Sequence, residues 1–205
     1  MKNLYLIRHG LAEHNALFKN FGKRIFYDKR YYDTKLIGEG KDQALLLNKT
    51  WADLEKIDIV FCSSLTRTLE TAELIFKGTN VPIYALDILK EFPQGVQTCN
   101  KRSNKDVLEK QFPTIIFSMV KTNEDCMWRP DSLESISELN DRIAISKYIL
   151  KCRPENNIAI IGHNSFIGQF KDNKIPLIEN GDDELKHCYP YIMKSIINKP
   201  YFINK

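Results

Sequence analysis

The stretch Asn3–Asn15, "NLYLIRHGLAEHN", joins a short apolar run to a basic and titratable turn. Its Leu-Tyr-Leu-Ile run is rich in strand-forming residues and too short for a helix, which predicts a buried β-strand. The run ends abruptly at Arg8, His9 and Gly10. Because ligands bind at the carboxyl ends of the strands in an open α/β sheet, the stretch predicts that Arg8 and His9 reach an anion-binding edge. Taken alone, it is equally compatible with an edge histidine followed by an ordinary turn glycine.

Strand-like and helical segments alternate along the rest of the chain. Apolar runs typical of buried strands occupy residues 3–9, 57–64, 81–87 and 156–165, and helical spacing occupies residues 37–56, 65–76 and 132–151. This alternation predicts an α/β fold, a three-layer α/β/α sandwich around a mostly parallel sheet. Residues 91–130 lack clean periodicity and hold three prolines, which predicts loops and short helices. No repeat or linker divides the chain, so we expect residues 1–205 to form a single domain.

Two segments near the carboxyl end carry more specific signals. Ser135 and Glu138 form a possible capping box at the start of a helix whose apolar face includes Ile136. Residues 187–199 could supply a last strand, and Pro190 would push that strand to an edge or a bulge, because proline cannot donate to the ladder.

Composition and cysteine usage restrict the class of protein. Of the 205 residues, 43% are hydrophobic and 27% are charged, which is ordinary for a soluble globular domain. No segment approaches the ~20 apolar residues of a membrane span, and the first apolar run is too short for a signal peptide. The five cysteines are odd in number, scattered and without a CxxC pair, which favours free thiols in the cytoplasm. The four histidines lack zinc-ligand spacing.

The net charge of +4 does not by itself indicate a nucleic-acid partner. Lysine and arginine are spread along the chain without a run of five and without a nucleic-acid motif. A basic cleft for a small phosphorylated molecule explains the charge as well. We therefore expect a small phosphorylated substrate, with no nucleic acid and no membrane as partner, and leave a homodimer open.

Arginine or histidine side chains stand at or just after the ends of three predicted strands. The first ends in Arg8 and His9, the second is followed by Arg67, and the fourth ends in His163 and Asn164. Parallel strands place these ends on one edge of the sheet. Arginine forks bind phosphate oxygens bidentately, and a histidine near a phosphate dianion tends to be protonated. The same ends carry no carboxylate cluster for Mg²⁺, so the pattern predicts a site that stabilises a dianion without a metal or cofactor.

Five ordered motifs together resemble the histidine phosphatase superfamily, in its phosphoglycerate-mutase-like branch. They are "LIRHG", "DTKLIGEGKDQA" (with Ile37 where the family has threonine), "SSLTRTLETA", "LKEFPQG" and "IAIIGHNSF". The irregular middle of the chain also resembles fungal and plant phosphoglycerate-mutase-like proteins, several of which are phosphatases. The resemblance implies that His9 is the nucleophile and that Glu91 is the proton donor. It also implies a set of phosphate-binding residues: Arg8, Asn15, Arg67, His163 and Asn164.

What the resemblance implies is a metal-independent phosphomonoesterase that acts through a phosphohistidine on His9. A phosphoglycerate mutase, a phosphoprotein phosphatase and a non-catalytic phospho-ligand-binding protein remain alternatives. Glu13 or Asp33 could replace Glu91 as the proton donor. No motif gives His14 or His187 a catalytic role. We interpret His14 as loop structure or substrate rim, and His187 as structural.

The basic segment Thr98–Lys105, "TCNKRSNK", follows the predicted acid closely. It is either a solvated loop or a second anion site, and Arg102 is its best candidate for binding a distal phosphate or carboxylate, because its fork binds such groups bidentately.

Overall fold

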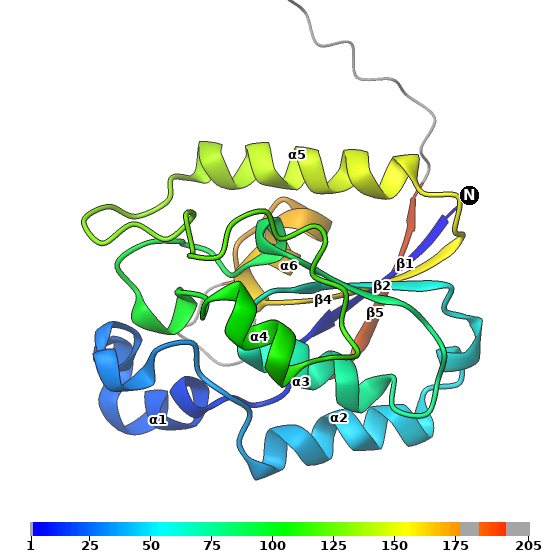
Figure 1. The fold of residues 1–205 in the computed structure, drawn as a ribbon, viewed down its shortest axis with the longest axis horizontal. Coiled ribbons are helices and arrows are strands. Elements are labelled where there is room, and N and C mark those ends of the chain that lie inside the picture. Colours follow the sequence, from blue (N-terminus) through cyan, green and yellow to red (C-terminus); the bar gives the residue numbers. More distant parts are fainter. Residues whose placement is uncertain (1, 177–184, 196–205) are drawn as a thin grey trace, which may run out of the picture.

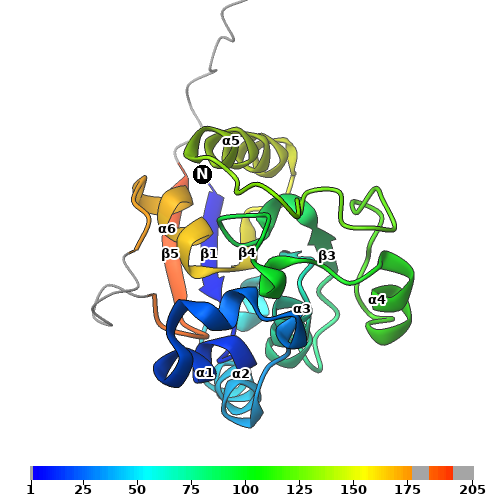
Figure 2. The ribbon, with the colours of Figure 1, turned by 90° about the vertical axis from the view of Figure 1, so that its left-hand side faces the viewer.

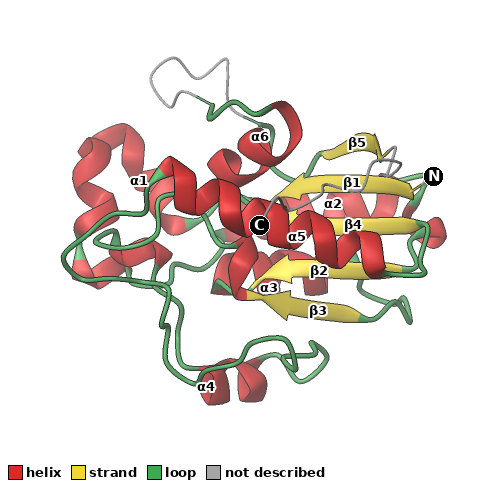
Figure 3. Cartoon of the chain, turned by 90° about the horizontal axis from the view of Figure 1, so that it is seen from above, coloured by secondary structure: helices red, strands yellow, loops and turns green. Residues whose placement is uncertain are grey.

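The computed structural model describes residues 2–176 and 185–195, which contain one five-stranded sheet in the order β3-β2-β4-β1-β5. The first four strands in this order are parallel, and β5 pairs antiparallel with β1 (Figure 3). The predicted mostly parallel sheet is therefore confirmed. The strands are β1 (Lys2–Arg8), β2 (Ile59–Ser63), β3 (Ile83–Leu86), β4 (Asn157–Gly162) and β5 (Pro190–Ser195).

Helices cover both faces of the sheet, which confirms the three layers (Figures 1 and 2). Side chains alternate along β1, so that Tyr5 and Ile7 enter one apolar core while Leu4 and Leu6 enter the other. The first core also receives α2 (Gly38–Thr50) and α3 (Thr66–Ile75). The second receives α5 (Ile136–Cys152) and α6 (Asn164–Asp172). Each fully buried leucine or isoleucine stabilises the sandwich by roughly 1.5–3 kcal/mol.

Two local predictions near the carboxyl end are confirmed, and one is wrong. The Ser135 hydroxyl accepts from Glu138 N and the Glu138 carboxylate accepts from Ser135 N, the reciprocal capping box at the start of α5. Strand β5 lies at the sheet edge and begins at Pro190; residues 196–199 of the predicted strand lie outside the described residues. Ile136 is 53% exposed and does not belong to the apolar face of α5.

The remaining elements are short. Helix α1 (Glu13–Phe21) follows the turn after β1, and the 3₁₀ turns η1 (Gly22–Tyr27) and η2 (Lys29–Tyr31) lead towards α2. The turn η3 (Leu54–Lys56) precedes β2.

The segment between β3 and α5 is irregular, as predicted. It contains η4 (Asp87–Leu89), η5 (Thr98–Asn100) and α4 (Lys105–Gln111). Buried ion pairs hold this segment together, whereas a regular sheet is held by backbone hydrogen bonds. Lys90 Nζ lies 2.5 Å from an Asp125 carboxylate oxygen with both side chains fully buried, and Arg142 Nε lies 2.5 Å from Glu134 Oε1.

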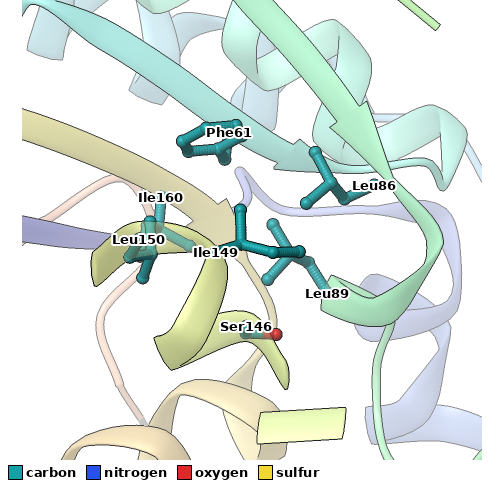
Figure 4. A pocket seen from close by; sticks show the side chains of 7 residues that line it. All are labelled: Phe61, Leu86, Leu89, Ser146, Ile149, Leu150 and Ile160. Carbon is teal, nitrogen blue, oxygen red and sulfur yellow. The ribbon is translucent and has the colours of Figure 1, made fainter. Parts of the chain in front are cut away.

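A small cavity lies between the sheet and α5 (Figure 4). Ser146 is its one polar lining residue, and its lining has no titratable side chain, so it cannot perform the chemistry expected of the active site. The apolar lining residues are Phe61, Leu86, Leu89, Ile149, Leu150 and Ile160.

Candidate active site

The carboxyl ends of β1, β2 and β4 meet at one edge of the sheet, as the sequence predicted. Arg8 pairs in register with Gly162, and the backbone N–H of His9 donates to the Gly162 carbonyl at 3.0 Å. This pairing places the ring of His9 5.1 Å from the ring of His163, centroid to centroid. From the helix after β2, Arg67 donates its Nε–H to His9 Nε2 at 3.3 Å. Three distant parts of the chain thus form one buried site.

Two helices clamp the loop that follows His9. Gly10 N donates to Thr71 Oγ1 of α3 at 3.1 Å, and Leu11 N donates to Gln43 Oε1 of α2 at 2.9 Å. The contact with α2 requires glycines, because a Cβ on Gly40 would lie 2.1 Å from Leu11 O and one on Gly10 would lie 2.4 Å from Gly40 O. The "RHG" and "GEGKDQA" motifs are therefore two sides of one close backbone contact.

The imidazole of His9 has a defined tautomer. Its Nδ1 lies 2.7 Å from the Gly10 carbonyl oxygen, which can only accept, so Nδ1 carries the proton. Nε2 then keeps its lone pair and accepts from Arg67. Burial holds the pKa of His9 well below its usual value, and the positive charge of Arg67 lowers that pKa further. His9 is a neutral imidazole with an unprotonated Nε2 at pH 7.

Arg67 is fully buried, and three of its five N–H donors have partners among the described residues. Besides His9, they are the Cys99 carbonyl at 2.7 Å and Asn100 Oδ1 at 2.9 Å. Asn100 in turn donates from Nδ2 to Gln97 Oε1 at 3.0 Å. Asn100 thus orients Arg67. No pattern in the sequence pointed to this role beyond the place of Asn100 in the "TCNKRSNK" segment.

His163 is fully buried at the amino end of α6. Its Nε2 lies 2.8 Å from Ser63 Oγ, and its Nδ1 has no hydrogen-bond partner among the described residues. Ser63 Oγ also accepts from Leu65 N at 3.4 Å, so this hydroxyl joins His163 to the end of β2. Burial and the charge of Arg67 hold the pKa of His163 well below its usual value in the absence of an anion.

Glu91 lies just after β3 and η4, where its carboxylate covers the start of α6. Its Oε1 accepts from Phe92 N at 2.8 Å and from Phe166 N at 3.1 Å, and its Oε2 accepts from Ser165 N at 3.3 Å. Burial raises the pKa of Glu91, although these backbone donors and Arg67 oppose the shift. The segment after β3 therefore brings a buried carboxyl group to the amino end of α6, which His163 precedes.

The two alternative acids are engaged elsewhere. Asp33 Oδ1 accepts from Thr66 N at the start of α3, and its Oδ2 accepts from Thr66 Oγ1 and Ser103 N. Glu13 Oε2 accepts from Lys35 N in an exposed position.

The other predicted phosphate ligands lie at the same edge. Arg8 Nη1 donates to the Leu185 carbonyl at 2.8 Å. Asn164 Oδ1 accepts from Leu185 N, and its buried Nδ2 has no partner among the described residues. Asn15 Oδ1 accepts from Ala12 N at 3.3 Å at the start of α1.

Arg102 is a correction. The sequence left it open whether Arg102 lies in a solvated loop or faces the catalytic pocket as part of a second anion site. Neither holds for Arg102, because its side chain is fully buried and its donors bind the protein. Nε donates to Asp87 Oδ1 at 2.9 Å, and the two Nη atoms donate to four backbone carbonyls. The carbonyls belong to Thr122, Asn123, Glu124 and Ser103. With these bonds made, Arg102 holds the irregular segment together and has no fork to offer a substrate.

Two histidines that the sequence left outside the chemistry also lie here. The rings of His14 and His187 are centred 6.2 and 5.6 Å from that of His9. His187 Nδ1 lies 2.5 Å from the His9 carbonyl oxygen, and burial together with Arg8 lowers the pKa of His187 to about 4. No local pattern revealed this, because His187 is 178 residues from His9 along the chain.

Two other features, a metal-binding cluster and a membrane-spanning helix, are absent from the described ranges. Within residues 2–176 and 185–195, no three His, Cys, Asp or Glu side chains are grouped so that they could hold a metal ion. Over the same ranges, no helix combines the length and the apolar character needed to cross a membrane.

Known proteins share both the sequence pattern and the fold. The chain is 28% identical to the phosphoglycerate mutase-like protein 1 of Arabidopsis thaliana over an alignment of 227 residues, covering 95% of this chain and 76% of the relative. The alpha-ribazole phosphatase of Shigella flexneri superposes with a TM-score of 0.60 at 19% identity, covering 91% of this chain and 87% of that one. The phosphoserine phosphatase of Entamoeba histolytica superposes with a TM-score of 0.56 at 20% identity, covering 95% and 96%.

A family model for the histidine phosphatase superfamily (branch 1) matches residues 4–171, which include all five motifs from "LIRHG" to "IAIIGHNSF". Since this match spans most of the sequence and the plant relative agrees with it, the chain belongs to the histidine phosphatase superfamily, in its phosphoglycerate-mutase-like branch.

Proposed function

We propose that this protein is a phosphomonoesterase that hydrolyses a small phosphorylated metabolite through a phosphohistidine on His9, without a metal ion. The ring of His9 is the observation that supports this most directly. The Gly10 carbonyl holds its Nδ1, and its unprotonated Nε2 faces Arg67 in a buried cationic site. A neutral imidazole with a directed lone pair beside a fixed guanidinium suits in-line attack on phosphorus.

The reaction has two steps, in which Glu91 acts first as an acid and then as a base. First, an N–P bond forms at His9 Nε2 while the bond from phosphorus to the leaving oxygen breaks, and Glu91 gives that oxygen a proton. Water then attacks the phosphorus of the phosphohistidine, and Glu91 takes up the proton of the water. The N–P bond breaks, its electron pair returns to His9 Nε2, and inorganic phosphate leaves. Burial raises the pKa of Glu91, which supports a carboxyl that holds a proton in the first step. Arg8, Arg67 and His163 oppose the charge on the equatorial oxygens.

The alternatives lose support from the same geometry. A mutase must hold a second anionic group while it retains the phosphohistidine, and the donors of Arg102, the candidate for that group, are engaged by the protein. A non-catalytic phosphate binder has no need of an unprotonated, carbonyl-held His9 or of a buried Glu91.

The proposal is tested by trapping the intermediate. Wild-type protein mixed with a ³²P-labelled phosphomonoester and quenched in base should carry a label that is acid-labile and base-stable, and His9→Ala should carry none and lose turnover. Activity should survive EDTA, because side chains supply the positive charge. Wild-type turnover in His9→Ala, or a strict metal requirement, would overturn the proposal. Transfer of the label to an added phosphoglycerate instead of water would identify a mutase.

A further inference from the structure

All four histidines of the chain surround one point, although only two of them take part in the proposed reaction. The rings of His14, His163 and His187 lie 6.2, 5.1 and 5.6 Å from the ring of His9, centroid to centroid. His187 is explained by its bond to the His9 carbonyl. His14 makes no bond to the loop that carries His9, so its place beside the nucleophile needs another reason.

The ring of His14 is held in one orientation. It lies in the first turn of α1 and is 6% exposed, and its Nδ1 is 2.6 Å from the Thr34 hydroxyl, which is itself buried. Phe26 packs against the ring at 5.9 Å, and Phe18 stacks on Phe26 at 5.4 Å. The ring therefore lies between an apolar wall and His9. The bond to Thr34 engages Nδ1 and leaves Nε2 as the second nitrogen of the ring.

The groups around His14 are arginines and histidines, and no carboxylate among them offsets the positive charge of the arginines. Arg8 and His9 face it from β1, Arg67 from α3, His163 from the end of β4, and His187 from the segment before β5. Burial, with the charges of Arg67 and Arg8, holds the pKa of His14 well below its usual value.

The carboxylates nearest along the chain have other partners. Glu13, the preceding residue, accepts from Lys35 N, and Asp33, beside Thr34, accepts from Thr66 and Ser103. A histidine ring buried among cations is best stabilised by an anion that enters the site.

We infer that His14 is a further phosphate-binding residue of the active site, which donates a hydrogen bond from Nε2 to the bound phosphoryl group while Thr34 fixes its ring. The inference rests on the proposed phosphate site and adds a ligand to it. The dianion supplies the missing negative charge, so it raises the pKa of His14 and binding takes up a proton. Affinity for the dianion therefore falls as the pH rises through the pKa of His14 in the complex.

The first test uses the wild-type protein, labelled with ¹⁵N-histidine, and inorganic phosphate as the probe. Long-range ¹H–¹⁵N spectra of the imidazoles, assigned with a His14→Gln variant, should show that phosphate converts His14 Nε2 to a hydrogen-bonded N–H or an imidazolium. If the two nitrogens of His14 keep their shifts at saturating phosphate, the inference is wrong and His14 is a core histidine.

Matched substitutions test the two nitrogens separately. The side-chain amide of asparagine can replace Nδ1 and that of glutamine can replace Nε2, so His14→Asn should weaken phosphate binding about 10- to 100-fold and His14→Gln much less. Thr34→Val should weaken it more than Thr34→Ser, which keeps the hydroxyl. Thermal unfolding of each variant verifies that it is folded.

The outcomes separate this inference from the proposed function. Equal phosphate affinity in His14→Asn and wild type would overturn the role of His14, whatever the reaction is. A normal response of His14 to phosphate without any labelled phosphohistidine would overturn the hydrolytic mechanism and leave His14 as a phosphate ligand.

Discussion

At the scale of single residues, Glu91 shows how two effects act in opposite directions on one carboxyl. The amino end of α6 favours a negative charge, and three backbone N–H groups bind the Glu91 carboxylate. Burial disfavours the same charge, and it is the larger effect, so the pKa of Glu91 is raised. A carboxyl balanced in this way can give a proton in one step and take one in the next.

We expect Glu91→Gln to slow the hydrolysis of alkyl phosphates roughly 10²-fold or more, because their leaving oxygen needs a proton. p-Nitrophenyl phosphate has a good leaving group and should be affected much less. The ratio of kcat/KM on the two substrates is the measurement, and the nitrophenyl rate also verifies that α6 is undisturbed. If both substrates lose the same factor, the proton donor is another group, and Glu13 is the remaining acid of the two alternatives.

At Arg102, the charge of the side chain does not indicate a contact with the substrate. A run of basic residues beside the proposed proton donor suggested a substrate contact, yet Arg102 is fully buried and binds Asp87 and backbone carbonyls. Lys90 and Asp125 form a second buried pair in the same segment. Removing one partner of such a pair leaves an uncompensated buried charge, so these residues determine stability rather than specificity.

At the scale of elements, the active-site loop depends on how closely α2 approaches it. Gly10 and Gly40 let the two backbones touch, and Ile37 N donates to Leu11 O at 3.1 Å. Ile37 stands where the family has threonine, and it begins α2 without a side-chain cap. The contact between backbones, rather than a capping hydroxyl, fixes the start of this helix.

Gly40→Ala should therefore destabilise the protein by about 1–3 kcal/mol and reduce kcat/KM, because its Cβ would meet backbone atoms that cannot turn away. Gly38→Ala, two residues earlier in α2, is the matched control, since a Cβ there meets nothing within 4 Å. Urea unfolding and kinetics on both variants give the comparison. Equal stability of the two variants would show that α2 can shift without cost.

At the scale of the whole molecule, the histidine cluster links folding to pH. All four histidines have a pKa below the value of about 6.5 expected in the unfolded chain. Below that pH the unfolded state binds more protons than the folded state, so the free energy of unfolding falls as the pH falls. The raised pKa values of Glu91 and Glu70 have the opposite effect on the free energy of unfolding. These two carboxyl groups are outnumbered by the four histidines.

We expect stability to be nearly constant between about pH 7 and pH 8 and to fall steadily from about pH 6.5 towards pH 4, where the pKa of His187 lies. Each histidine that stays neutral in the fold contributes a slope of about 1.4 kcal/mol per pH unit well below its unfolded pKa. Urea unfolding at a series of pH values measures the slope, and His187→Gln should reduce it by the share of one histidine. A flat profile between pH 7 and pH 5 would contradict the prediction.

Sequence alone predicted the layers, the positions of the strands and the convergence of the candidate site residues at one edge of the sheet. Strand and helix periodicity is a local property of the sequence. Because parallel strands present their carboxyl ends at one edge of the sheet, residues that follow different strands are brought together there. Arg8, His9, Arg67 and His163 follow strand ends or a helix start, so their positions along the chain are enough to bring them together.

Only the tertiary structure decided which other polar residues share that edge. His187 reaches the His9 carbonyl across 178 positions, Asn100 orients Arg67, and Arg102 turns into the protein rather than towards the site. Nothing in the neighbourhood of these residues along the chain distinguishes a ligand from a buried ion partner. Their roles depend on which donors and acceptors the packing of distant segments leaves within hydrogen-bond distance, and that is a property of the folded chain.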